Sequence, residues 1–203
     1  LYESDGKLAE AVSVYQTLIR KMEGVSFAGE SIPEKAKEQI SRIIAAHGRK
    51  VYEKFENRAR ELVRLGKTTG NPSCFLEVIK YYPHSTIRET AFEEMLTYLY
   101  SKRRHRNLIE LFTRYGRNIK ISPKTMAKIL LLLGWTYHKL GLQPLSLSIG
   151  YEISRDLSNV KMVTVNGKQV IVQQEASRLI EMSPSEDECE VHPPQIRPVS
   201  YTH

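Results

Sequence analysis

The stretch from Ile129 to Gly141 constrains the fold more than any other part of the chain. It reads Ile-Leu-Leu-Leu-Leu-Gly-Trp-Thr-Tyr-His-Lys-Leu-Gly, and it contains the densest apolar run, the only tryptophan and a Lys-Leu-Gly ending that is typical of a helix terminus. A helix needs about 20 apolar residues to cross a bilayer, so the run is too short to span one. We therefore interpret the stretch as a helix that is buried on most sides in a helical array.

The composition indicates a soluble globular protein, with 41% apolar and 26% charged residues. The 203 residues suffice for one or two ordinary domains with a core. The chain begins without methionine inside a predicted helix and ends on Val-Ser-Tyr-Thr-His. We therefore expect it to be a fragment of a longer protein.

Periodic apolar side chains predict helices along most of the chain. Their three- and four-residue spacing gives each segment one apolar stripe, and Gly, Pro, Ser or Asn residues stand at the segment ends. The predicted helices cover residues 8–22, 33–46, 49–65, 72–81, 87–100, 107–115, 123–140 and 143–157. Residues 24–33, rich in Gly and Ser, are expected to form a connector.

The character of the chain changes after residue 157. Asn166-Gly167 lies between two apolar runs and favours the type I′ turn of a β-hairpin. We expect residues 158–182 to form this hairpin and a short helix that cap the array; the alternative is that the hairpin adds strands to a partner or a downstream domain. Residues 183–203 are rich in proline and acidic residues, which predicts a disordered linker or tail.

The long helix and its successor carry a repeat-like pattern. Leu133, Gly134 and Tyr137 share one helix face, Gly141 follows in the turn, and Ser146 stands early on the next helix. This pattern resembles the tetratricopeptide repeat (TPR), in which small residues let the two helices of a pair approach closely. Two departures are Ser146, where alanine is usual, and Gly150, where an aromatic residue is usual.

Two upstream segments resemble the same repeat. Ala59, Gly66, Phe75, Val78 and Pro83 follow one another at its spacing, with Asn71 in place of the usual small residue. The first helix resembles the second half of a truncated repeat. Its matching residues are Gly6, Ala11, Tyr15 and Leu18, and the Tyr81–Ser85 segment is similar to the junctions between repeats in bacterial envelope proteins.

The resemblance implies an all-α fold of stacked antiparallel helix pairs, a TPR-like α-solenoid over residues 1–157. Helical repeats followed by a proline-rich linker are also similar to the N-terminal region of large bacterial envelope proteins that continue into a quinoprotein-like (PQQ-type) β-propeller. That likeness favours a cell-envelope or periplasmic location over the cytoplasm. It would also place any catalytic domain beyond His203.

The sequence contains no pattern of a known catalytic or metal site. Phosphate-binding glycine loops, zinc-protease helices and nucleophile elbows are absent, and the histidines at 47, 84, 105 and 138 have no partner constellation. Cys74 and Cys189 are too far apart in sequence to suggest a disulfide framework, and Cys189 with His192 is only half a metal site. We therefore expect no enzyme activity, no cofactor, no metal and no small-molecule substrate.

The positive charge is concentrated in one region. Residues 80–128 hold eleven Lys or Arg and four Glu, a surplus that equals the chain's net charge of +7. Its sharpest feature is the run Lys102-Arg103-Arg104-His105-Arg106. Two interpretations remain open: a binding site for a phosphate-rich partner, or a solvated turn between repeat helices.

These features predict a non-catalytic scaffold that presents a concave surface to a protein or peptide partner. One alternative is binding of nucleic acid or anionic membrane through residues 102–128, and another is a structural arm for a downstream domain. The candidate partner-binding residues are Tyr98, Lys102, Arg103, Arg104, Arg106, Lys128 and His138.

Overall fold

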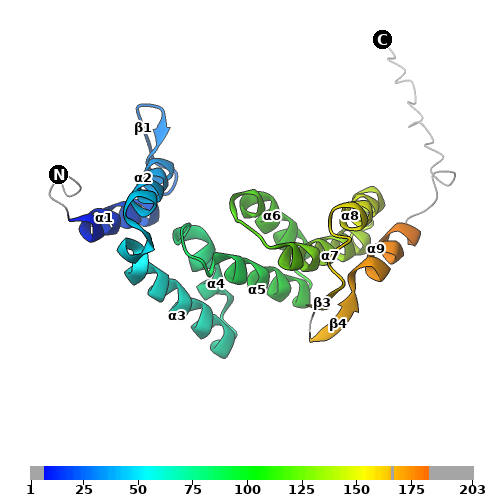
Figure 1. Cartoon of the computed structure of the whole chain (residues 1–203). Coiled ribbons are helices and arrows are strands. Elements are labelled where there is room, and N and C mark those ends of the chain that lie inside the picture. Colours follow the sequence, from blue (N-terminus) through cyan, green and yellow to red (C-terminus); the bar gives the residue numbers. More distant parts are fainter. Residues whose placement is uncertain (1–6, 166, 183–203) are drawn as a thin grey trace, which may run out of the picture.

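The computed structural model describes residues 7–165 and 167–182, which form nine α-helices, two 3₁₀ turns and two small hairpins (Figure 1). The α-helices are α1 (Leu8–Lys21), α2 (Ile32–His47), α3 (Glu53–Thr69), α4 (Pro72–Tyr81), α5 (Arg88–Ser101), α6 (His105–Tyr115), α7 (Pro123–Lys139), α8 (Gln143–Asp156) and α9 (Val172–Glu181). The other elements are η1 (Arg49–Tyr52), η2 (Gly116–Asn118), β1 (Ser26–Phe27), β2 (Glu30–Ser31), β3 (Met162–Val165) and β4 (Lys168–Ile171).

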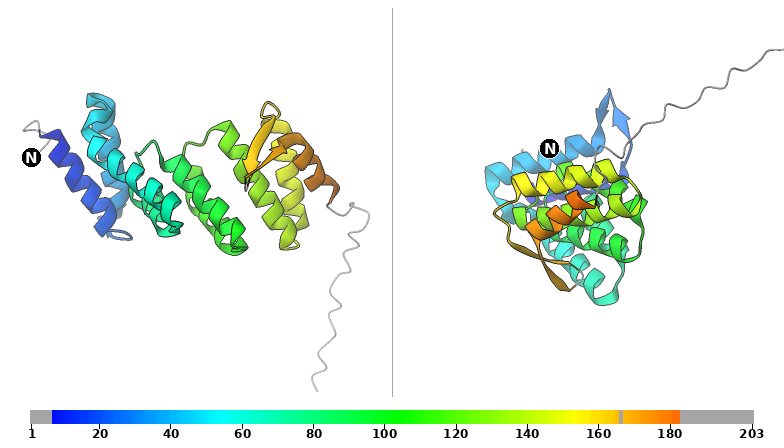
Figure 2. Two further views of the ribbon diagram at one scale, coloured as in Figure 1. Left: turned by 90° about the horizontal axis from the view of Figure 1, so that it is seen from below. Right: turned by 90° about the vertical axis from the view of Figure 1, so that its right-hand side faces the viewer.

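Neighbouring helices pack as pairs that follow one another along the molecule (Figures 1 and 2). The pairs are α1 with α2, α3 with α4, α5 with α6 and α7 with α8, and α9 then packs on α8 and α7. A helix with one apolar stripe has to cover it with another helix, and stacked pairs do so along the whole array. The predicted all-α class of stacked helix pairs with a C-terminal hairpin is confirmed. The predicted tail at 183–203 lies outside the described residues.

The apolar stretch from Ile129 to Leu133, in the middle of α7, is buried as expected. Every side chain from Ile129 to Leu133 is at most 3% exposed, and Trp135 and Tyr137 are half-buried against the same core. Within the described ranges, no helix combines the length and apolar character that a bilayer span requires. The stretch is therefore the centre of the helical core.

Some predicted boundaries were wrong. Residues 49–52 form the 3₁₀ turn η1, and α3 continues past residue 65 to end at Gly70, whose φ is +67°. Gly66 is thus inside the helix, where an added Cβ would lie 2.8 Å from Cε1 of Phe75 on α4. Its small size serves the packing of α3 on α4 rather than a turn. The connector at 24–33 also contains an unpredicted two-residue hairpin, β1–β2.

The C-terminal hairpin and α9 cover the end of the array. β3 pairs with β4 in antiparallel register, with Val163 opposite Val170, and Val163 is buried in the main core. The helix after the hairpin begins at Val172, directly after β4. Leu179 on α9 is fully buried. The hairpin and α9 therefore pack against the last helix pair, α7 and α8.

Two apolar clusters make up the core, and a buried polar network joins them. The smaller cluster belongs to α1, α2 and η1, and the larger one extends from α3 to α9. Gln16 on α1 is 6% exposed; its Oε1 accepts a hydrogen bond of 3.1 Å from the Tyr52 hydroxyl, and its Nε2 donates to the Tyr81 carbonyl. Tyr52 is fully buried, and this burial raises the pKa of its phenol. The network therefore ties the N-terminal helices to α4.

We expect Gln16→Leu to lower the free energy of unfolding by about 1–3 kcal/mol, because the Tyr52 hydroxyl and the Tyr81 carbonyl would lose their partner inside the protein. Urea denaturation measures the change. Ser13→Ala is the matched control, since Ser13 also lies on α1 but bonds only within its own exposed helix turn. Equal stability of Gln16→Leu and the parent would show that the network does not stabilise the fold.

Candidate functional site

The basic run forms the turn between α5 and α6. The Arg104 N–H donates to the Leu99 carbonyl at 2.9 Å and the Arg103 N–H donates to the Tyr100 carbonyl at 3.0 Å, which is the Schellman arrangement of a helix C-terminus. The turn between α7 and α8 has the same bonds, from Leu142 to Tyr137 and from Gly141 to His138. The two helix pairs therefore share one turn geometry.

Arg103 occupies the position in this turn that usually requires glycine. Its φ is +55°, in the left-handed region, whereas the equivalent residue of the α7–α8 turn is Gly141 with a φ of +73°. A side chain in this conformation costs roughly 1–2 kcal/mol, and strain of this kind is often kept where a side chain serves function. The strained residue here is an exposed cation.

We expect Arg103→Gly to raise the free energy of unfolding by about 1 kcal/mol, because glycine adopts this backbone conformation without the steric cost. Arg103→Ala is the control, because it removes the charge but keeps the Cβ, and its stability should stay near that of the parent. Thermal and urea unfolding compare the three proteins. If glycine and alanine had the same effect, the left-handed conformation would not be strained.

Four exposed cations make up what we call the basic turn: Lys102, Arg103, Arg104 and Arg106. Within residues 7–165 and 167–182, none of them forms an ion pair with a carboxylate. Lys139, at the end of α7, adds a fifth cation beside them. Its Nζ lies 5.1 Å from the centre of the Tyr100 ring. The basic turn thus has a local charge surplus that no carboxylate of the described residues compensates.

Aromatic rings lie directly beneath these cations. The Lys102 Nζ lies 6.0 Å from the ring centre of Tyr98, and the Tyr100 ring lies 6.0 Å from those of both His105 and Trp135. Burial is the main cause of a lowered pKa at His105, and Lys139 and Arg103 add to it. His105 is therefore a neutral part of this surface. The arrangement combines exposed positive charge with half-buried flat rings, which suits acidic or aromatic partner groups.

The structure places Lys128 apart from this group and His138 against the start of α8. Lys128 pairs with Glu93 at 2.6 Å, and its side chain is only 15% exposed. It lies eleven residues before Lys139 on α7, about 16 Å along the helix axis. The ring Nδ1 of His138 lies 3.1 Å from Oε1 of Gln143 at the start of α8. Of the predicted residues, the basic turn and Tyr98 are brought together.

The wider basic region of 80–128 is not one surface. Lys80 and Arg114 both pair with Glu23, at 3.2 and 3.7 Å, and Arg88 is buried. Arg117, Lys120 and Lys124 are exposed but follow α6, whose eleven residues separate them from the basic turn by about 16 Å. The surplus charge seen in the sequence is therefore divided among an exposed turn, a cluster around Glu23, the buried Arg88, and a distant loop with the first turn of α7.

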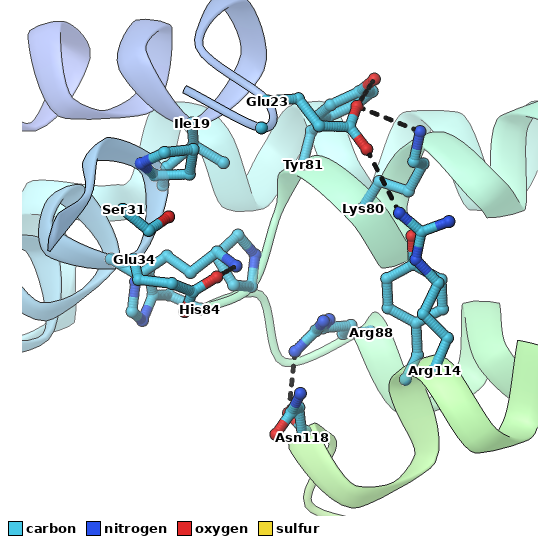
Figure 3. Close-up of a pocket in the computed structure, with 15 residues that line it drawn as sticks. Ile19, Glu23, Ser31, Glu34, Lys80, Tyr81, His84, Arg88, Arg114 and Asn118 are labelled. Atoms are coloured by element: carbon cyan, nitrogen blue, oxygen red, sulfur yellow. Dashed lines mark hydrogen bonds and ion pairs between the residues drawn. The ribbon is translucent and has the colours of Figure 1, made fainter. Parts of the chain in front are cut away.

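A polar hollow lies between the N-terminal helices and the middle of the array, and no sequence pattern predicted it (Figure 3). Its volume is about 510 Å³, and we call it the Arg88 hollow. Its walls come from the end of α1, the first turn of α2, the end of α4, the start of α5 and the end of α6. Its charged lining residues are Glu23, Glu34, Lys37, Lys80, Arg88 and Arg114.

Arg88 crosses the floor of this hollow. The guanidinium Nε donates to the Ile79 carbonyl at 3.0 Å and Nη1 donates to the Asn118 carbonyl at 2.9 Å, so that one side chain ties α4 to η2. Arg88 is the first residue of α5, a position where the helix dipole disfavours a cation. This unfavourable placement of a cation at a helix N-terminus is the one feature of the sequence that indicates a specific structural role for Arg88.

His84 lines the same hollow and is held uncharged. Burial, and to a smaller extent the nearby Arg88 guanidinium, lower the pKa of its imidazole to about 4. Its Nε2 is buried and has no hydrogen-bond partner in the described part of the chain, while Nδ1 lies 3.5 Å from the Ser41 hydroxyl. A proton on this ring would add to the positive charge of the hollow.

We expect His84 to destabilise the protein in acid. Its pKa is about 4 in the folded state against 6.5 when unfolded, so the unfolded chain binds the proton more tightly, and stability is lost as the pH falls from 6.5 towards 4. Urea unfolding should show a loss of about 2 kcal/mol between pH 6.5 and 5 that is absent from His84→Gln. Equal losses in both proteins would contradict a buried, neutral His84.

Among the residues that the structure describes, no three His, Cys, Asp or Glu side chains are grouped so that they could hold a metal ion. Cys74 is a free, buried thiol on α4, whereas Cys189 and His192 lie outside the described residues.

Comparisons of this chain with protein families, with curated proteins and with solved structures found no match.

Proposed function

We propose that the protein is a non-catalytic helical-repeat scaffold that binds an acidic segment of a partner protein at the basic turn. The observation that carries the proposal is the uncompensated charge of Lys102, Arg103, Arg104 and Arg106, with Arg103 kept in a strained conformation where glycine would be favoured. Lys139 and the rings of Tyr98 and Tyr100 extend the same surface.

The size of the basic turn favours a short protein segment over nucleic acid. A nucleic-acid site that neutralises 6–10 phosphates needs cations along an extended track. Here the remaining cations of residues 80–128 are paired with glutamates, buried, or placed at the other end of α6. A few acidic side chains on an extended or helical peptide match the charge and extent of the basic turn.

The only tryptophan gives a direct binding signal. Trp135 is half-buried and lies 6.0 Å from Tyr100, so a ligand on the basic turn should change its fluorescence. Titration with an acidic peptide that lacks tryptophan therefore tests the proposal on the intact chain. Single-stranded oligonucleotides and vesicles of anionic lipid serve as competing ligands.

Two charge-matched variants locate the site. Changing Lys102, Arg104 and Arg106 to Ser should weaken peptide binding at least about tenfold, since each removes an uncompensated cation from the contact. Changing Arg117, Lys120 and Lys124 to Ser removes the same charge from the far end of α6, the following loop and the first turn of α7. This change should alter binding less than about twofold. Arg103 is left unchanged so that its strain does not affect the comparison.

Three results would overturn the proposal. The first is equal weakening by both variants, which would indicate only a long-range charge effect. The second is tighter binding of an oligonucleotide than of the peptide, with affinity falling steeply as salt rises. The third is tighter binding to anionic vesicles than to the peptide, which would assign the basic turn to a membrane surface.

A further inference from the structure

The Arg88 hollow holds a positive charge that is not neutralised by any carboxylate of the part of the chain that the structure describes. Arg88 is only 8% exposed, and both of its hydrogen bonds go to neutral backbone carbonyls. Within the described ranges it forms no ion pair with a carboxylate. Burying a cation without a counter-charge is costly, and bonds to carbonyls compensate only part of that cost. The tie between α4 and η2 explains the position of Arg88 but not its missing counter-charge.

The charged residues of the hollow, taken together, also leave an excess of positive charge. Four cations and two glutamates line it, which gives a net excess of two positive charges. Glu34 forms an ion pair with Lys37 at 2.5 Å, and Glu23 forms ion pairs with both Lys80 and Arg114. Figure 3 shows Lys80 and Arg114 on one side of the hollow, Ser31 and Glu34 on the other, and Arg88 below.

The first turn of α2 adds to this field. Ser31, Pro33, Glu34 and Lys37 line the hollow, and Ser31 stands at the N-cap position without using its side chain to cap the helix. In this first turn the Ile32 N–H donates to the Val25 carbonyl at 3.1 Å and Pro33 has no N–H, so the Glu34 N–H is the one left without an acceptor in the helix. The helix dipole is also positive at this end. Backbone donors and the positive end of a dipole are the usual elements of a phosphate site.

We propose that the Arg88 hollow binds a compact phosphate dianion, as free phosphate or as the phosphate group of a small monoester. Two negative charges match the excess of two, and phosphate oxygens are acceptors that suit a guanidinium, an ammonium and the Glu34 N–H together. The volume of about 510 Å³ is in the range of small-molecule sites and exceeds the need of phosphate alone. Tyr81 and Tyr115 provide aromatic walls for an organic part.

This site is independent of the proposed function. The basic turn lies at the opposite end of α6 from Arg114 and η2, so the two sites share no residue. The phosphate group would also bridge the first two helices and the middle of the array, because both line the hollow. Bound phosphate should therefore raise the unfolding temperature of the whole chain.

Isothermal titration of the full chain tests the proposal with three probes at constant ionic strength: inorganic phosphate, glycerol phosphate and succinate. We expect saturable binding of one phosphate compound per chain, at least tenfold tighter than succinate. Tighter binding of glycerol phosphate would assign the site to a monoester, and tighter binding of phosphate would assign it to the free ion. Absence of saturable phosphate binding, or equal affinity for succinate, would overturn the proposal.

Variants tie the binding to the hollow. Arg114→Gln removes a cation whose side chain is 59% exposed, so the fold should persist while phosphate affinity falls at least tenfold. Arg88→Lys keeps the charge but loses the paired carbonyl bonds, and Arg88→Gln removes the charge; phosphate affinity should fall in that order. Lys67→Gln is the control, since Lys67 pairs with Glu94 away from the hollow. Unchanged affinity in Arg114→Gln, or an equal loss in Lys67→Gln, would contradict the assignment even if Arg88→Gln failed to fold.

Discussion

Gly134→Leu should lower the free energy of unfolding by about 3 kcal/mol or more, the upper part of the range for an overpacked core. An added Cβ at Gly134 would lie 2.5 Å from Cδ1 of Leu179 on α9 and 3.2 Å from Cγ2 of Ile149 on α8. The Ser146 hydroxyl also donates to the Gly134 carbonyl at 3.1 Å, which fixes the distance between α7 and α8. A leucine side chain would therefore have to displace two helices from α7.

Three further variants identify the cause of this loss. Gly134→Ala should change the free energy of unfolding by less than about 1 kcal/mol. The higher helix propensity of alanine offsets the cost of the close contact between its Cβ and the flexible end of the Leu179 side chain. Lys124→Leu places the same leucine on an exposed position of α7 and should be nearly neutral. Leu179→Ala combined with Gly134→Leu should lose less than the sum of the two single changes, because the truncation makes room. Additive losses would show that Leu179 does not face Gly134.

The region around Gly134 shows what the sequence could and could not predict. Gly134 and Ser146 were expected to bring two helices close together, and the structure confirms the contact between them. Leu179 was not expected there, because the spacing within a helix pair contains no information about a helix that returns after a hairpin. Local periodicity thus predicted the helices and the contact between Gly134 and Ser146. The contact with Leu179 depends on how the chain returns after the hairpin, which local periodicity does not indicate.

The two candidate sites also differ in how far the sequence could predict them. The basic turn could be found from sequence, because its cations are consecutive and the turn signals around them are local. The Arg88 hollow could not, because Glu23 and Lys80 are 57 residues apart and meet only when α1 packs beside α4. The same long-range pairing neutralises part of the charge surplus, so that the predicted patch of residues 102–128 is smaller in the structure than in the sequence.

Gly66 matches the repeat pattern and Gly150 departs from it, and both have a packing role in this structure. At Gly66 the neighbour is the Phe75 ring, within the same helix pair. At Gly150, where the repeat pattern has an aromatic residue, an added Cβ would lie 2.8 Å from Cγ1 of Ile180 and 3.0 Å from the backbone oxygen of Ala176. The glycine therefore lets α9 lie against α8, in a place that an aromatic side chain would otherwise fill.

Gly150→Phe restores the residue typical of the repeat pattern, and we expect it to lower the free energy of unfolding by about 3 kcal/mol or more. The Ala176 carbonyl is part of the α9 backbone, so relief requires the whole helix to shift. For the same reason Gly150→Ala should cost more than Gly134→Ala, whose nearest neighbour is a side-chain end. Urea unfolding gives the order, and hydrogen exchange over 172–181 should show α9 loosened first. A neutral or stabilising phenylalanine would mean that α9 does not lie against Gly150, and that the aromatic position of the repeat is open.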